Sequence, residues 1–308
     1  CTGEKRTETM GHIITDLKEA FRRGNVYIQL IFINVGVFVV TTLIGILLQL
    51  FNRSAAGIFE LLALPASFTR FVWQPWSIFT YMFMHAGFLH ILFNMLWLYW
   101  FGSLFLYFFS GKHLRGLYIV GGICGGLLYM ISYNVFPYFR PMTAYSTMVG
   151  ASASVLAIVV ATAYREPNYP VRLLFFGNVR LKYLALIVVL TDLFFITSSN
   201  AGGHIAHLGG ALAGLWFAAS LNKGKDITSW VNKALDAIAA LFSAKTWKRK
   251  PKMKVHYGNN TRQNDYDYYD RKKAQSDEID RIHDKLKKSG SESLTTEEKK
   301  SLFDASKR

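Results

Sequence analysis

Four polar groups stand inside otherwise apolar stretches of this chain, and their residue types could carry out acyl-transfer chemistry. The first is HAGFLHILFN, in which His90 and Asn94 are four positions apart. The second is Ser152 within VGASASVL, the third is Asp192, and the fourth is His207 within GGHIAHLGGALAG. Polar side chains are costly in a membrane helix, so each indicates either a reaction centre or a bridge between helices.

Ser152 and His207 have the types required for covalent catalysis. A serine beside a histidine is the minimal nucleophile and general base, because the imidazole takes the hydroxyl proton and later returns it to the leaving amine. A tetrahedral intermediate also requires hydrogen-bond donors aimed at its oxyanion. The Asn94 amide, the His90 imidazole and the backbone N–H of Ser152 could supply these donors.

Two further polar residues are expected to be structural. Side chains two positions apart on a helix point in directions that differ by about 200° around its axis. Ser152 and Ser154 therefore cannot both face His207. We expect the Ser154 hydroxyl to donate to a carbonyl one turn back in its own helix. Asp192 stands six or more residues below the outer end of its apolar segment. We therefore expect it to lie too deep to orient His207, which leaves the site without a carboxylate.

The serine, asparagine and histidine are predicted to lie at one depth when each is counted from the expected cytosolic end of its own segment. The separations are 13 residues from Ser152 to Arg165, 16 from Asn94 to Ser110 and 16 from His207 to Lys223. At about 1.5 Å per residue these correspond to about 20 to 24 Å. In a hydrocarbon core about 30 Å thick, this layer lies roughly 5 to 10 Å below the outer surface. The segment PYFRPMTAYSTMVGA before the serine is a poor helix, which predicts a wet cavity open to the outside.

The elements that carry these residues are predicted membrane spans. The chain has 308 residues, of which 51% are hydrophobic and 15% aromatic, and its mean hydropathy is +0.20 despite a polar tail. Six segments approach spanning length: residues 27–50, 78–109, 117–137, 146–164, 183–198 and 204–221. The fold class predicted is an all-α membrane protein, with a six-helix bundle over residues 27–221.

The net charge of +15 indicates a membrane rather than a nucleic-acid partner, because Lys and Arg gather in alternate connections between the spans. The opposite connections hold only Arg53, Arg70 and Arg140. By the positive-inside rule we expect both termini, including the N-terminal segment 1–26, in the cytosol.

The two cysteines, Cys1 and Cys124, are isolated in the sequence and predict neither a disulfide framework nor a zinc site. We expect no metal and no cofactor. Met10 begins a more natural start than Cys1, so residues 1–9 are not expected to belong to the natural chain.

The polar tail is predicted to have three parts. Residues 222–254 combine the apolar periodicity of ITSWVNKALDAIAALF with the basic run KTWKRKPKMK. They predict an amphipathic helix that either lies on anionic lipid or packs on the ends of the spans. Residues 255–276 are expected to be a flexible linker. Residues 277–308 predict a small helical hairpin, with Thr295 and Glu298 as a capping box.

Three motifs in this order across six helices, HILFN, GASA and AHLGGALAG, resemble those of the rhomboid family of intramembrane serine proteases, in particular bacterial members. The resemblance covers about residues 27–221. It implies a serine endopeptidase of the bacterial cytoplasmic membrane whose substrates are transmembrane proteins, cut near the outer end of their helices.

The resemblance also implies a role for each polar residue. It implies a dyad of Ser152 and His207 without an acid, and an oxyanion hole of His90, Asn94 and the Ser152 amide. His85 is implied to be a structural hydrogen-bonding residue. Three glycines have physical roles as well. These are a tight turn into the helix at Gly150 and close helix packing at Gly210 and Gly214.

Two positions depart from the family pattern, and two other functions compete with proteolysis. Ala153 stands where the family often has Gly, and Leu156 where an aromatic residue often stacks on the catalytic histidine. A catalytically inactive rhomboid-like protein that binds membrane helices would share the fold, but it normally lacks the serine or the histidine. A proton-coupled transporter is disfavoured because the first and last three spans show no internal repeat.

Overall fold

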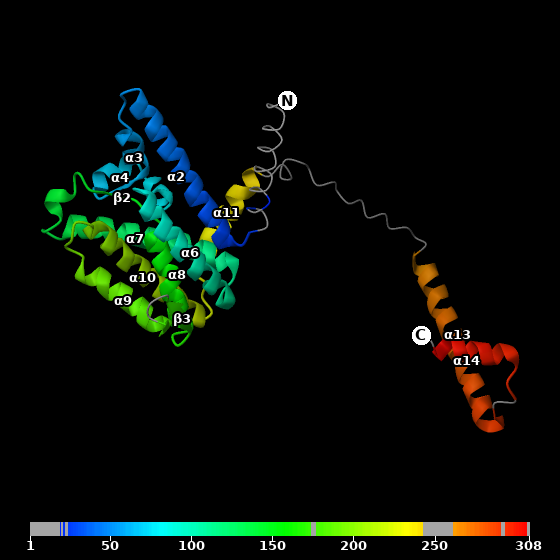
Figure 1. Ribbon diagram of the computed structural model, residues 1–308. Helices are drawn as coiled ribbons and strands as arrows, with labels where there is room; N and C mark the ends of the chain where they lie inside the picture. Colours follow the sequence, from blue (N-terminus) through cyan, green and yellow to red (C-terminus); the bar gives the residue numbers. More distant parts are fainter. Residues whose placement is uncertain are drawn as a thin grey trace, which may run out of the picture. The chain divides into compact units, whose positions relative to one another are not determined.

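The computed structural model of this chain describes Glu19, Phe21 and residues 24–173, 177–242, 261–290 and 293–306. The chain forms two compact units, residues 1–243 and 244–308 (Figure 1). Most of the expected N-terminal segment, the basic run KTWKRKPKMK and the beginning of the expected linker lie outside the described residues.

Six apolar helices build the first unit. They are α2 (Val26–Leu50), α6 (Phe88–Phe108), α7 (Gly111–Val135), α8 (Ser152–Arg165), α9 (Leu181–Phe194) and α10 (Ala201–Asn222). Four of these, α2, α6, α7 and α10, are long and apolar enough to cross a membrane. Helices α8 and α9 have 14 residues each, fewer than the roughly 20 that a full crossing needs. The predicted all-α membrane fold is confirmed, with shorter fourth and fifth helices than expected.

The second and fourth predicted spans begin later than expected, because the residues before them make other contacts. Residues 78–109 are divided into α5 (Ser77–Thr80), η1 (Tyr81–Phe83) and α6. Residues 146–151 are not helical. Instead β2 (Thr147–Met148) pairs antiparallel with β1 (Leu64–Pro65), and the Gly150 amide donates to the carbonyl of Tyr81 at 2.9 Å. The connection after α2 therefore fixes where α8 starts.

The connection after α2 holds two short helices, α3 (Ala56–Leu62) and α4 (Phe68–Trp73). The indole of Trp76 donates to the carbonyl of Leu61 at 2.9 Å and closes this segment on itself. Trp73 in this segment is exposed, and tryptophan is enriched at membrane–water interfaces. The shorter connections contain η2 (Arg140–Met142) and the antiparallel pair β3 (Pro170–Leu173) and β4 (Gly177–Arg180).

Helix α8 is the centre of the bundle, and all its residues from Ala153 to Ala163 are buried. It packs against α6, α7, α9 and α10, and Figure 1 shows it among them. Gly210 and Gly214 lie directly against the carbonyls of Ala153 and Ala157, where any side chain would overlap the backbone. Small residues thus allow α8 and α10 to approach closely.

Helix α11 (Ser229–Phe242) packs on α7, which supports the second of the two arrangements predicted for it. The amide of Asn232 donates to the carbonyl of Lys112 at 3.0 Å. Arg115 donates to Asn232 at 3.1 Å and forms an ion pair with Asp236 at 2.9 Å. The opposite face leaves Trp230 exposed. One side of this helix therefore belongs to the bundle, and the other stays free to meet lipid.

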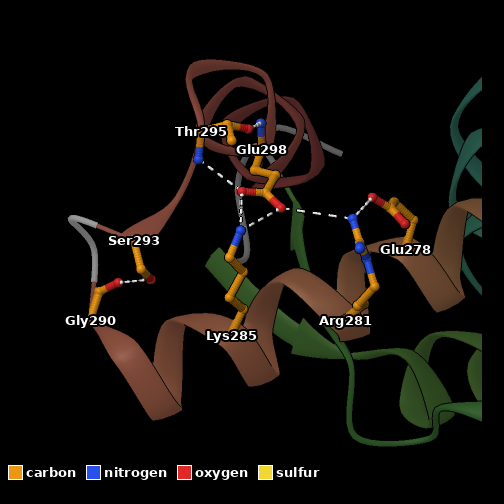
Figure 2. Close-up of polar contacts among 7 residues, drawn as sticks. All are labelled: Glu278, Arg281, Lys285, Gly290, Ser293, Thr295 and Glu298. Carbon is orange, nitrogen blue, oxygen red and sulfur yellow. Dashed lines mark hydrogen bonds and ion pairs between the residues drawn. The ribbon is translucent and has the colours of Figure 1, made fainter.

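The second unit is a helical hairpin of α13 (Thr261–Ser289) and α14 (Thr296–Ser306). The expected linker is wrong for residues 261–276, which belong to α13; polarity marks an exposed helix as well as a disordered one. The capping box is confirmed. The Thr295 amide donates to Glu298 at 2.8 Å, and the Glu298 amide donates to the Thr295 hydroxyl at 3.3 Å (Figure 2). The Thr295 amide and then Lys285 hold the pKa of Glu298 below its usual range.

Candidate active site

A cavity of about 680 Å³ lies at the N-terminal ends of α6, α8 and α10. Its lining includes His90 and Asn94 of α6, Ser152 of α8 and His207 of α10. The three groups that were predicted to lie in one layer thus border one space. Three helix N-termini also direct positive dipole ends toward this region, which favours a negative charge there.

Ser152 is the first residue of α8, directly after a turn that only glycine makes readily. Gly150 has a φ of +136°, which L side chains rarely adopt. The first intrahelical hydrogen bond after this turn runs from the Val155 amide to the Ala151 carbonyl. The amides at the start of a helix have no partner within it, so the Ser152 N–H is available to an oxyanion.

Gly150 also leaves room between two functional atoms. A Cβ placed on Gly150 would lie 2.9 Å from Nε2 of His90 and 3.6 Å from Oγ of Ser152. The imidazole of His90 and the serine hydroxyl thus lie on the same side of this glycine. A methyl group at this position would crowd the histidine.

The hydrogen bonds of His90 and Asn94 leave donors free for the cavity. The Ala86 amide donates to Nδ1 of His90 at 3.4 Å, so this nitrogen is the acceptor and Nε2 carries the proton. The Asn94 amide donates to the carbonyl of His90 at 2.9 Å. A carboxamide has two N–H groups, so the second one remains for a ligand. Both side chains can therefore donate to an oxyanion.

His207 has a carboxylate partner, which corrects the expectation for Asp192. Nδ1 of His207 lies 2.8 Å from Oδ1 of Asp192, and Nδ1 of His204 lies 2.8 Å from the same oxygen. Asp192 lies less deep than predicted, because α9 ends at Phe194, only two residues after the aspartate, and not near Ser198. Asp192 thus lies at the end of its helix, level with the first turns of α10.

His204 is a further member of this cluster, for which the sequence predicted no role. The signal available in the sequence was its spacing of three positions from His207, which places both imidazoles on one helix face. The ligand atoms of Asp192, His204 and His207 lie within 4.8 Å of one another, so a metal ion is sterically conceivable. Each nitrogen is nevertheless at an ordinary hydrogen-bond distance from the shared oxygen.

Residues 72–223 match the Rhomboid domain family. These residues form a domain of the rhomboid family. A curated relative, RHOMBOID-like protein 12, mitochondrial, of Arabidopsis thaliana, is 28% identical over 158 residues. The match covers 48% of this chain and 47% of the relative. The matched region thus spans about half the length of that relative. Residues 264–308 match a family of unknown function, DUF6576. This segment includes most of α13 and all of α14.

Four helices of membrane-crossing length make this rhomboid an integral membrane protein. The mitochondrial location is part of the name of the plant relative and is a property of that protein. A bacterial cytoplasmic membrane and cytosolic termini stay predictions for this chain.

Ser154 of this rhomboid differs from Ser152 in its surroundings. Its side chain is buried and faces α7, where a Cβ on Gly122 would lie 2.8 Å from its Oγ. The expected hydrogen bond to its own helix is wrong, since Oγ has no hydrogen-bond partner within the described part of the chain. The different directions of the two serines follow from their spacing, and only Ser152 lines the cavity described above.

His85 supports the site by packing. The side chain is buried, and its ring lies edge-on to the ring of His90 with centroids 5.1 Å apart. The implied hydrogen bond is not found, because neither ring nitrogen has a partner of regular geometry among the residues that the structure describes. His85 therefore restricts the orientation of His90 through ring contact.

The two departures from the family pattern both lie on α8, in different surroundings. Ala153 is buried, and a Cβ on Gly125 of α7 would lie 2.6 Å from its methyl group. An alanine is thus accommodated because glycine stands opposite. Leu156 is buried and lines the cavity together with His207, so an aliphatic wall replaces an aromatic one.

Proposed function

We propose that this rhomboid is a serine endopeptidase that cleaves transmembrane helices within the membrane, near their outer end. The observation that carries the proposal is that Ser152, His207, His90 and Asn94 border one cavity at three helix N-termini. These are the residue types of a nucleophile, a general base and oxyanion donors. Its substrates are transmembrane proteins held in the same lipid bilayer.

In the proposed reaction the hydroxyl oxygen of Ser152 attacks the scissile carbonyl carbon while Nε2 of His207 accepts the hydroxyl proton. Only Nε2 is free for this role, because Nδ1 contacts Asp192. The carbonyl oxygen becomes an oxyanion, which accepts hydrogen bonds from His90, Asn94 and the Ser152 amide. His207 then protonates the leaving amine, and a water molecule from the cavity hydrolyses the acyl-enzyme through the same base.

A labelling experiment tests this assignment. Ser152→Ala should abolish both labelling by a serine-reactive fluorophosphonate and cleavage of a single-span reporter protein, because the attacking oxygen is removed. Ser154→Ala is the matched control, since it changes the same group two positions away at a site outside the cavity lining. The control should keep both activities.

Two results would overturn the proposal. A folded Ser152→Ala protein that still labels and cuts would exclude this serine as the nucleophile. A folded wild-type protein that neither labels nor cuts would instead favour a catalytically inactive protein that binds membrane helices.

A further inference from the structure

We infer that Asp192 is a positioning residue for His207, so that the reaction centre is a Ser–His pair held by a buried carboxylate. The inference rests on the proposed function and adds a third side chain to it. The carboxylate comes from α9, whereas the nucleophile and the base come from α8 and α10.

The first observation is the placement of the carboxylate. Asp192 is 4% exposed, and its Oδ1 lies 2.8 Å from Nδ1 of both His204 and His207. Its Oδ2 is buried and has no hydrogen-bond partner within the described ranges. A buried carboxylate is costly unless donors compensate it, so the two imidazoles are the groups that stabilise it.

The second observation concerns the tautomer of His207. A carboxylate oxygen accepts but does not donate, so the contact at 2.8 Å requires a proton on Nδ1 of His207. This tautomer leaves the lone pair on Nε2, the nitrogen that must accept the proton of Ser152. The same contact restricts rotation of the imidazole, whose side chain lines the cavity. A serine beside a histidine of the opposite tautomer would have no base.

His204 contacts the same carboxylate oxygen as His207. Its ring packs on Phe195 with centroids 5.9 Å apart, which connects it to the residue after α9. His204 and His207 are three positions apart on α10 and so share one face. Asp192 is thus fixed between two donors of one helix, which defines the position of the carboxylate relative to the base.

A metal ion explains these distances less well than hydrogen bonds do. Ligands of a tetrahedral zinc ion with bonds of about 2.0 to 2.1 Å stand about 3.3 Å apart. The two nitrogen–oxygen distances here are 2.8 Å, as in hydrogen bonds. The shared oxygen with two N–H donors therefore needs no ion.

Asp192→Asn in the full chain tests the inference, because it keeps the shape of the side chain and removes the charge. We expect the fluorophosphonate labelling rate and kcat for the reporter to fall by about 10²- to 10⁴-fold, with KM unchanged within about twofold. Thr191→Val is the matched control: the neighbouring hydroxyl is exposed and donates only to the carbonyl of Ile187 in its own helix. It should retain wild-type kcat and labelling.

A second measurement does not depend on activity. Nitrogen NMR of ¹⁵N-histidine-labelled protein in bilayers, with the His207 signal assigned by its loss in His207→Asn, should show the proton on Nδ1. Asp192→Asn should shift that population toward Nε2.

The outcomes separate this inference from the proposed function. Wild-type kcat in folded Asp192→Asn, a change confined to KM, or a wild-type His207 protonated only on Nε2 would each overturn the role of Asp192. An inactive wild-type protein would overturn the protease assignment instead, and the NMR result would still decide the position of the proton.

Discussion

At the scale of single residues, the Asn94 side chain divides its two N–H groups between its own helix and the cavity. One donates to the carbonyl of His90 at 2.9 Å, and the other is free for the oxyanion. We expect Asn94→Ala to fold normally and to lose on the order of 10²-fold or more in kcat, because one preorganised donor is removed. Steady-state cleavage of the reporter measures this loss.

A serine-to-alanine change on the same helix, α6, serves as the control for Asn94→Ala. The hydroxyl of Ser103 donates to the carbonyl of Trp100 at 2.8 Å within the same helix and does not line the cavity. Ser103→Ala should leave kcat unchanged. Unaltered turnover in a folded Asn94→Ala protein would remove the amide from the mechanism.

At the scale of elements, the contact between α8 and α10 sets the distance between the proposed nucleophile, Ser152, and the proposed base, His207. Gly210 lies against the carbonyl of Ala153, which is backbone and cannot rotate away. Gly210→Ala should lower the free energy of unfolding by about 1 to 3 kcal/mol, as overpacking does, and should reduce cleavage. Thermal unfolding in detergent together with reporter cleavage tests this.

Gly36 of α2 provides the comparison for Gly210. A Cβ at Gly36 meets nothing within 4 Å, so Gly36→Ala adds a better helix former without a clash. Its unfolding temperature should be equal to or above that of the wild type. If both variants unfolded at the same temperature, close packing of α8 and α10 would not limit stability.

At the scale of the whole molecule, the two units separate the proposed chemistry from the tail. The residues that line the cavity belong to the unit 1–243, and α13 and α14 belong to the unit 244–308. Cutting the chain after Lys254 should therefore leave reporter cleavage in detergent largely intact. Loss of cleavage with unchanged unfolding would show that the hairpin acts on the reaction.

The sequence by itself identified four of the residues that line the cavity, His90, Asn94, Ser152 and His207, and the helices that carry them. The rise of a helix is fixed, so the common depth of Ser152, Asn94 and His207 could be counted along each segment. The capping box of Thr295 and Glu298 was predictable for a similar reason, because it depends on residues three positions apart.

Only the tertiary structure decided which neighbours these residues have. The carboxylate of Asp192 meets His207 because α9 ends early, and the start of α8 depends on a ladder with residues 64–65, far away in the chain. The unpartnered hydroxyl of Ser154 is likewise set by the face that α7 presents to it. Such contacts depend on where each helix ends and how closely its neighbours approach, and these are properties of packing rather than of local periodicity.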